Sequence, residues 1–93
     1  MILDFSCKHT EKVWNGVRTT KWDSKIQKIA LRKLFMINAA HKLFDLKVPP
    51  GNNLHPLKDD LNGYQGIKIN DQWRIIFIWS GNDAESVKIT DYH

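Results

Sequence analysis

Apolar residues recur about every 3.6 residues from Ser24 onward, and this is the clearest pattern in the chain. The positions concerned are Ile26, Ile29, Ala30, Leu34, Ile37, Ala40 and Phe44. This period predicts a long amphipathic helix that begins near Asp23 or Ser24, either of which can cap it. The helix should end near Leu46, because the Pro-Pro-Gly sequence at residues 49–51 cannot continue it.

Weaker patterns precede this helix. An apolar run at residues 2–5 predicts a short edge or first strand, and residues 9–15 predict a short helix with Thr10 as its candidate cap. Residues 16–22 are polar and lack a clear period, so we expect a loop there.

The second half of the chain predicts strands. Residues 64–69 and 73–79 are rich in β-branched and aromatic side chains, and the Asn-Asp-Gln sequence between them predicts a hairpin turn. With all three of these residues in the turn, Lys68 lies opposite Arg74 and the neighbouring isoleucines face each other. This register pairs apolar with apolar and basic with basic residues, whereas a two-residue turn would mix them.

The hairpin register divides the predicted sheet into two unlike faces. One face is apolar and should pack against the long helix through Ile67, Ile69, Trp73, Ile75, Phe77 and Trp79. Lys68 and Arg74 share the opposite face. A second turn at residues 80–85 and a last strand at residues 86–90 complete an α+β domain, with helices early in the chain and a mainly antiparallel sheet late.

The composition fits one globular domain. The chain has 93 residues, of which 42% are hydrophobic and 26% are charged. Cys7 is the single cysteine, which excludes an intramolecular disulfide and cysteine-based zinc sites. We find no secretory signal and no apolar stretch long enough to cross a membrane, so we expect a cytoplasmic protein without membrane contacts.

Positive charge is concentrated toward the amino terminus. The net charge is +4, but residues 1–33 carry eight basic and three acidic side chains, whereas residues 34–93 carry six and seven. Basic residues recur there at spacings of three or four, at Lys21, Lys25, Lys28, Arg32 and Lys33. On a helix, most of them would form a basic stripe that attracts phosphate, although the solvated face of an ordinary amphipathic helix has the same pattern.

Few residues are candidates for chemistry. The chain has no Walker loop, dinucleotide fingerprint, nucleophile elbow or HExxH motif, and its four histidines lack the spacing of metal ligands, so we expect neither a metal nor a cofactor. The pair of Lys68 and Arg74 is tolerated most easily where an anion lies between them, and Arg74 can hold a phosphate by two parallel hydrogen bonds. Two solvated cations, a structural His55 and a frayed carboxyl terminus remain the alternative interpretations.

Several motifs together resemble the HigB toxins of the RelE superfamily. They are Arg32-Lys33-Leu34, Ala39-Ala40, Asp45-Leu46, Pro49-Pro50-Gly51-Asn52, Leu54-His55-Pro56-Leu57, the hairpin from Ile67 to Ile75, and Thr90-Asp91-Tyr92-His93. The hairpin and the terminal Asp-Tyr-His are the most specific. The resemblance covers nearly the whole chain and implies a single toxin domain over residues 1–93 with a RelE-like fold, in which two amino-terminal helices pack on one face of a small twisted sheet.

This resemblance implies a type II toxin that acts as a metal-independent, ribosome-dependent mRNA endonuclease and is neutralised by a HigA-type antitoxin with a helix-turn-helix domain. The concave sheet face would meet the message in the ribosomal decoding site, beside 16S rRNA. The site residues implied by the motifs are His55, Lys58, Arg74, Asp91, Tyr92 and His93. Lys68 stands where the family usually has arginine, so the charge is kept but the two-pronged phosphate geometry is lost.

The implied reaction is attack of a ribose 2′-hydroxyl on the adjacent phosphate, which needs a base, an acid and cations for the charged phosphorane. His55 and His93 are the candidates for base and acid, in either order, and Asp91 can orient an imidazole. The residues expected to stabilise charge and contact RNA are Arg74, Lys68, Lys58 and Tyr92.

The basic stripe of Lys25, Lys28 and Arg32 would anchor the protein on ribosomal RNA. Two other functions remain open. One is a non-catalytic RNA- or ribosome-binding module that inhibits translation by occupancy, and the other is a toxin homologue whose activity has decayed. The occupancy model needs the basic surface but neither His55 nor His93.

Overall fold

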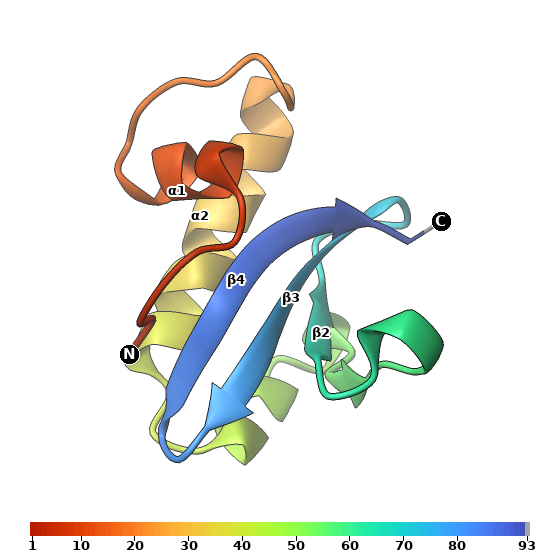
Figure 1. The fold of residues 1–93 in the computed structure, drawn as a ribbon. Coiled ribbons are helices and arrows are strands. Elements are labelled where there is room, and N and C mark those ends of the chain that lie inside the picture. Colours follow the sequence, from red (N-terminus) through yellow and green to blue (C-terminus); the bar gives the residue numbers. More distant parts are fainter. Residues whose placement is uncertain (93) are drawn as a thin grey trace.

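Residues 1–92, which the computed structural model describes, form two α-helices followed by a four-stranded antiparallel sheet (Figure 1). The helices are α1 (Lys8–Trp14) and α2 (Ser24–Ala39), and the strands, adjacent in chain order, are β1 (His55–Pro56), β2 (Gln65–Lys68), β3 (Trp73–Ser80) and β4 (Asp83–Asp91). Three short 3-10 helices, η1 (Leu43–Lys47), η2 (Pro50–Asn52) and η3 (Asp59–Leu61), lie between α2 and β2. The predicted α+β class is confirmed.

The core lies between α2 and one face of the sheet, as the sequence pattern predicted. Ile67 pairs with Ile75 across β2 and β3, and both are fully buried together with Phe77. Ala30, Leu34 and Ile37 of α2 pack into the same cluster and are also fully buried. Trp73 and Trp79 border this cluster and stay partly exposed. The predicted hairpin register is therefore confirmed.

Helix α2 begins as predicted but ends earlier. The side chain of Asp23 caps it, since Oδ1 accepts a hydrogen bond from the N–H of Ile26 at 2.9 Å. The predicted end near Leu46 is wrong, because the backbone turns to an extended conformation at Ala40 and then enters η1. The Asp45 carboxylate accepts hydrogen bonds from the N–H groups of His41 and Lys42, and so stabilises this change of direction.

Thr10 does not cap α1, and this prediction is wrong. The helix begins at Lys8, and Thr10 lies within it, fully buried against β4. Its hydroxyl oxygen accepts a hydrogen bond from the N–H of Ile89 at 3.0 Å. Thr10 therefore supplies a partner to a buried backbone group 79 residues away, and local helix patterns do not reveal such a contact.

A Thr10→Val substitution tests this contact. The two side chains have similar shapes, but valine leaves the N–H of Ile89 without its acceptor in a buried place. We expect the free energy of unfolding to fall by about 1–3 kcal/mol, measured by urea denaturation. Thr10→Ser keeps the hydroxyl and is the control; equal losses in both variants would contradict the proposed contact.

The remaining segments extend the sheet at both edges. The amino-terminal run forms isolated parallel bridges from Ile2 to Ala84 and from Phe5 to Val87, rather than a continuous strand, and runs alongside β4 (Figure 1). The last strand is longer than predicted, because the pairing of Ser80 with Asp83 closes a tight turn over Gly81 and Asn82. Strand β1 was not predicted from the sequence.

Candidate functional site

The face of the sheet opposite α2 carries the basic pair. Lys68 on β2 lies opposite Arg74 on β3, and Arg74 lies opposite Thr90 on β4. Their sequence neighbours Ile67 and Ile75 point into the core beneath α2, so the alternating side chains point to the other face. The prediction that Lys68 and Arg74 share this face is confirmed. We call it the outer face of the sheet.

Lys68 already has an anionic partner within the hairpin. Its Nζ lies 2.9 Å from Oδ1 of Asp71 in the turn. The hydrogen bond and the charge of Asp71 raise the pKa of Lys68, and the same contact lowers the pKa of Asp71. This carboxylate offsets the repulsion between Lys68 and Arg74. The Asp71 side chain is fully exposed, so an incoming phosphate can take its place.

Arg74 lies against Tyr92, and both have unused hydrogen-bonding atoms. The guanidinium carbon is 4.9 Å from the centre of the Tyr92 ring, which is cation–π contact. Within residues 1–92, the buried Nε of Arg74 and the buried hydroxyl of Tyr92 have no hydrogen-bond partner. Unpartnered buried polar atoms are rare in proteins and often mark a place where a ligand or water completes the bonding.

The carboxyl-terminal segment is attached to the sheet as far as Tyr92. The N–H of Tyr92 donates to the carbonyl oxygen of Gln72 at 2.9 Å, and Asp91 pairs with Trp73 at the end of β4. The side-chain amide of Gln72 also reaches Oδ2 of Asp91 at 3.4 Å. For Thr90, Asp91 and Tyr92, the alternative interpretation as a frayed tail is therefore wrong. His93, predicted as a site residue, lies outside the described residues.

His55 lies on β1, and one of its ring nitrogens is engaged by the backbone. Its Nδ1 is 2.7 Å from the carbonyl oxygen of Asn53. Because a carbonyl only accepts hydrogen bonds, Nδ1 must carry the proton, and in the neutral ring Nε2 then has a free lone pair. The side chain is partly exposed. It can therefore accept a proton at Nε2, as a general base must.

Gly66 lies between two of the predicted catalytic side chains. It pairs with His55 on β1, and a Cβ atom at this position would lie 3.4 Å from Cδ2 of Leu57, 3.8 Å from Cε1 of His55 and 3.9 Å from Cδ of Arg74. His55 and Arg74 thus flank Gly66 on the outer face, where the buried Leu57 covers it. Tyr92 joins the group through its contact with Arg74.

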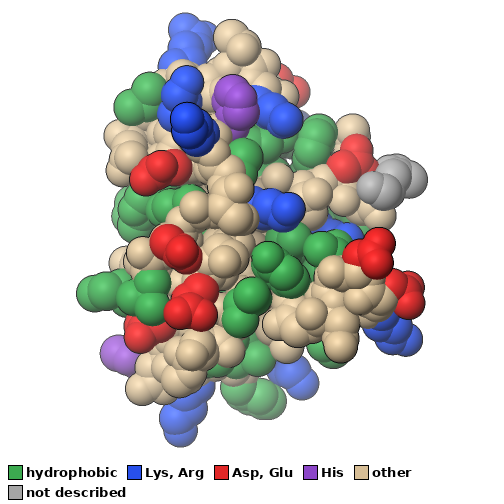
Figure 2. Space-filling view, viewed as in Figure 1, with side chains coloured by type: hydrophobic (Ala, Val, Ile, Leu, Met, Phe, Trp, Pro, Cys, Tyr) green, Lys and Arg blue, Asp and Glu red, His purple; other side chains and the backbone are tan. Residues whose placement is uncertain are grey.

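Other predicted residues lie apart from this group. Lys58 is exposed and precedes η3 at the β1 side of the sheet. The predicted RNA-binding residues Lys25, Lys28 and Arg32 are all exposed on α2, which covers the opposite face. Figure 2 shows basic side chains both at the end of the molecule where α1 lies and on the outer face of the sheet. The predicted site residues therefore form two separate basic surfaces.

Lys33 is an exception within the basic stripe, because it is buried. Its ammonium group donates to Oδ1 of Asn52 at 2.9 Å and to the carbonyl oxygen of Lys68 at 2.6 Å. Asn52 is itself fully buried, and its amide donates to the carbonyl oxygens of Leu46 and Val48 at 3.2 and 3.5 Å. This network joins α2 to η2 and to the end of β2 beside the site. The sequence held one signal, since Lys33 lies three residues after Ala30 on the apolar side of the helix.

The buried ammonium of Lys33 makes stability depend on pH. Burial lowers its pKa from the usual 10.5, with smaller effects from the charges of Arg32 and Lys68. The unfolded chain then binds more protons than the folded one between the lowered pKa and 10.5, so stability should rise with pH across that window. We expect wild type to gain stability relative to Lys33→Met between pH 7 and about 10, measured by parallel urea denaturation. A difference that stays constant with pH would contradict this expectation.

Residues 1–92 lack two further features. No three histidine, cysteine, aspartate or glutamate side chains there come close enough together to hold a metal ion. Nor does that part of the chain contain a helix of the length and apolarity needed to span a membrane.

Comparisons with known proteins give a consistent result. A family model described as "RelE-like toxin of type II toxin-antitoxin system HigB" matches residues 3–93. The chain is 35% identical over 80 residues to "Toxin HigB-1" of Vibrio cholerae, which covers 85% of this chain and 84% of that relative. A shorter match to "Endoribonuclease HigB" of Proteus vulgaris is 45% identical over 40 residues, 43% of this chain and 44% of that protein.

Solved structures share the fold at low sequence identity. The structure of YafQ from E. coli strain BL21(DE3) has a TM-score of 0.60 at 16% identity, covering 99% of this chain and 92% of that one. The YoeB/ParE toxin from Agrobacterium tumefaciens has a TM-score of 0.54 at 18% identity, covering 100% and 96% of the two chains. These similarities support the predicted RelE-like arrangement of helices and sheet.

Proposed function

Because the chain belongs to the HigB-like family of RelE-like toxins of type II toxin-antitoxin systems, we propose that it is a ribosome-dependent endoribonuclease that cleaves translated mRNA in the cytoplasm. The relative from Proteus vulgaris carries the name of an endoribonuclease, which supports this activity. The whole chain, residues 1–93, would act as one toxin domain.

The observation that carries the proposal is the grouping of Arg74, Tyr92 and His55 on the outer face. Arg74 flanks Gly66 together with His55, and its Nε has no hydrogen-bond partner within residues 1–92. A phosphate beside the guanidinium would receive charge-assisted hydrogen bonds from Arg74. Lys68, released from Asp71, would add a second positive charge beside it.

The proposed reaction is a transesterification within the RNA chain. The 2′-oxygen forms a bond to phosphorus while the bond to the 5′-oxygen of the next nucleotide breaks, which leaves a 2′,3′-cyclic phosphate and a 5′-hydroxyl. We assign the base to His55, whose Nε2 is free to take the 2′-hydroxyl proton when Nδ1 is bound to the carbonyl of Asn53. The acid that protonates the leaving 5′-oxygen is then assigned to His93.

The other predicted residues have supporting parts in this proposal. Asp91 would orient an imidazole, Tyr92 would position a phosphate or stack on a base, and Lys58 would add charge near the RNA backbone. The message would reach the outer face in the decoding site, where 16S rRNA fixes the geometry of the substrate. A type II toxin has a cognate antitoxin, and we propose that it is of the HigA type with a helix-turn-helix domain.

Mapping of mRNA 5′ ends tests the proposed activity. The purified protein is added to a translating bacterial extract beside His55→Ala and His93→Ala variants, with free RNA as the control. We expect new ends in frame on translated message, none on free RNA, and few or none with either variant. Inhibited translation without new ends would favour the non-catalytic occupancy model and remove the proton-transfer roles from both histidines.

The basic stripe on α2 gives a separate prediction about ribosome binding. Lys25→Glu combined with Arg32→Glu should weaken co-sedimentation with ribosomes, because each cation that contacts RNA phosphate displaces a counterion. The slope of log affinity against log salt should fall by about 2. The same charge change at the exposed Lys42 and Lys47 is the control, and equal effects in both double variants would contradict a specific role for the stripe.

A further inference from the structure

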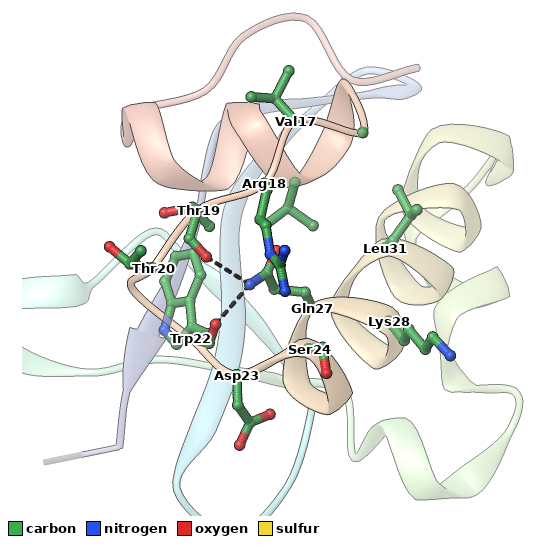
Figure 3. A pocket seen from close by; sticks show the side chains of 12 residues that line it. Val17, Arg18, Thr19, Thr20, Trp22, Asp23, Ser24, Gln27, Lys28 and Leu31 are labelled. Atoms are coloured by element: carbon green, nitrogen blue, oxygen red, sulfur yellow. Dashed lines mark hydrogen bonds between the residues drawn. The ribbon is translucent and has the colours of Figure 1, made fainter.

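A groove lies between α2 and the loop that joins α1 to α2 (Figure 3). Its volume is about 770 Å³, within the range of known binding pockets. Gln27 holds the loop in place, since its side-chain amide donates to the carbonyl oxygens of Thr19 at 2.8 Å and Trp22 at 2.6 Å. Nδ1 of His9 also lies 2.7 Å from the Thr19 hydroxyl. The groove is therefore a defined feature of the fold and has walls on two elements.

The lining of the groove combines aliphatic and basic side chains with polar ones and the carboxylate of Asp23. Among the aliphatic residues, Val13 is buried, Leu31 of α2 is half-buried, and Val17 of the loop is 51% exposed. Arg18 and Lys28 are both exposed; Figure 3 shows the Arg18 side chain extending from the loop toward Gln27 of α2, whereas Lys28 points away. The groove thus offers apolar contact next to positive charge.

The apolar surface continues along α2 beyond the groove. Phe35 lies one turn after Leu31 and is 56% exposed. Its ring packs on Trp14 of α1, with 5.1 Å between the ring centres. Exposed aliphatic and aromatic side chains in a row are typical of a surface that a partner protein covers.

We propose that this groove binds an acidic, amphipathic segment of the cognate antitoxin. Apolar side chains of that segment would pack between Val17 and Leu31, and its carboxylates would pair with Arg18 and Lys28. The excess of positive charge within residues 1–33 favours an acidic partner. The proposal rests on membership of a toxin-antitoxin family, which implies an antitoxin, and does not depend on the nuclease activity.

RNA fits this groove less well than a protein segment does. Single-stranded RNA is held by aromatic rings that stack on bases and by cations that pair with phosphates. The apolar part of the lining comes from Val13, Val17 and Leu31, on which bases do not stack, and Trp22, the aromatic residue of the lining, is only 5% exposed. Exposing these aliphatic groups is unfavourable in water, and apolar side chains of a protein partner would bury them.

The groove and the proposed catalytic group lie on different sides of the molecule. The helix α2 packs on the inner face of the sheet, whereas Arg74 and His55 flank Gly66 on the outer face. Val17→Asp and Arg18→Glu should therefore change antitoxin binding and leave RNA cleavage by the free toxin unchanged. This separation makes the two proposals testable independently.

Val17→Asp tests the groove, and Val48→Asp is its matched control. Both valines are exposed, at 51% and 72%, so neither substitution should disturb the core, and only Val17 lines the groove. Calorimetric titration with the purified cognate antitoxin should show affinity reduced by at least about 10-fold for Val17→Asp and by less than about 2-fold for Val48→Asp. Arg18→Glu should also weaken binding and reduce its dependence on salt.

Other outcomes would overturn the proposal. Antitoxin affinity equal to wild type in both Val17→Asp and Arg18→Glu would exclude the groove as the docking site. Unchanged antitoxin affinity with reduced ribosome co-sedimentation would make the groove an RNA contact instead. If the wild-type protein cleaves no message, the proposed nuclease function fails, but the titration still decides whether the groove binds the antitoxin.

Discussion

An Arg74→Ala variant is expected to cleave translated mRNA at least about 100-fold more slowly than wild type, which is typical for removal of a group that stabilises transition-state charge. Arg74 flanks Gly66 on the outer face, and the phosphate is proposed to bind beside its guanidinium. The phosphorane carries more negative charge than the substrate, so loss of this cation slows the chemical step more than it weakens binding. The rate at which new mRNA 5′ ends appear in a translating extract measures the effect.

The fold of Arg74→Ala should remain close to that of wild type. Arg74 is only partly buried, and its side chain makes a cation–π contact with Tyr92, whose backbone is held separately by Gln72. Circular dichroism and a thermal melt verify this. Arg18→Ala makes the same change on the exposed loop and should cleave at the wild-type rate. Full activity in a folded Arg74→Ala protein would remove Arg74 from the mechanism.

Arg74→Lys gives a finer comparison at the same position. It keeps the positive charge but removes the two parallel hydrogen bonds that a guanidinium can make to phosphate. We expect cleavage between that of wild type and Arg74→Ala. Lys68 already stands where the family usually has arginine, so Lys68→Arg should raise the rate or leave it unchanged.

Asn52→Ala is expected to have the largest effect on stability, lowering the free energy of unfolding by about 2–4 kcal/mol. This substitution removes an acceptor from the buried ammonium of Lys33 and a donor from the carbonyl oxygens of Leu46 and Val48. The ammonium group of Lys33 would then keep its hydrogen bond to the carbonyl oxygen of Lys68. A buried charge with too few partners is strongly unfavourable. The midpoint of urea denaturation measures the loss.

Asn62→Ala is the matched control for this substitution. Asn62 is exposed at the end of η3, and its loss should change stability by less than about 0.5 kcal/mol. A double-mutant cycle with Lys33→Met tests the network itself. If the two residues stabilise each other, Asn52→Ala should lower the free energy of unfolding by less when Lys33 is already replaced. Additive losses would show that the two side chains act independently.

The amino-acid sequence by itself determined the two α-helices, the β2–β3 hairpin and the last strand, apart from some of their ends. The apolar period of α2 and the alternation in β2 and β3 depend on neighbours three or four residues apart in a helix and two apart in a strand, so they are visible in the chain. The register of Lys68 opposite Arg74 followed from the need to pair like with like across the hairpin. The resemblance of motifs pointed to His55, Arg74 and Tyr92 as site residues. In the structure, His55 and Arg74 flank Gly66, and Tyr92 contacts Arg74.

The tertiary structure decided which polar groups share a buried space. Local patterns predict Thr10 at a helix end and Lys33 on a solvated stripe. In the fold, Thr10 bonds a strand residue 79 positions away, and Lys33 bonds Asn52 and Lys68 at 19 and 35 positions. It also separated the predicted RNA-binding residues onto two faces and formed a groove between α2 and the loop before it. The physical reason is that a polar group is stabilised by whatever partner the fold brings to it, and that partner is often distant in sequence.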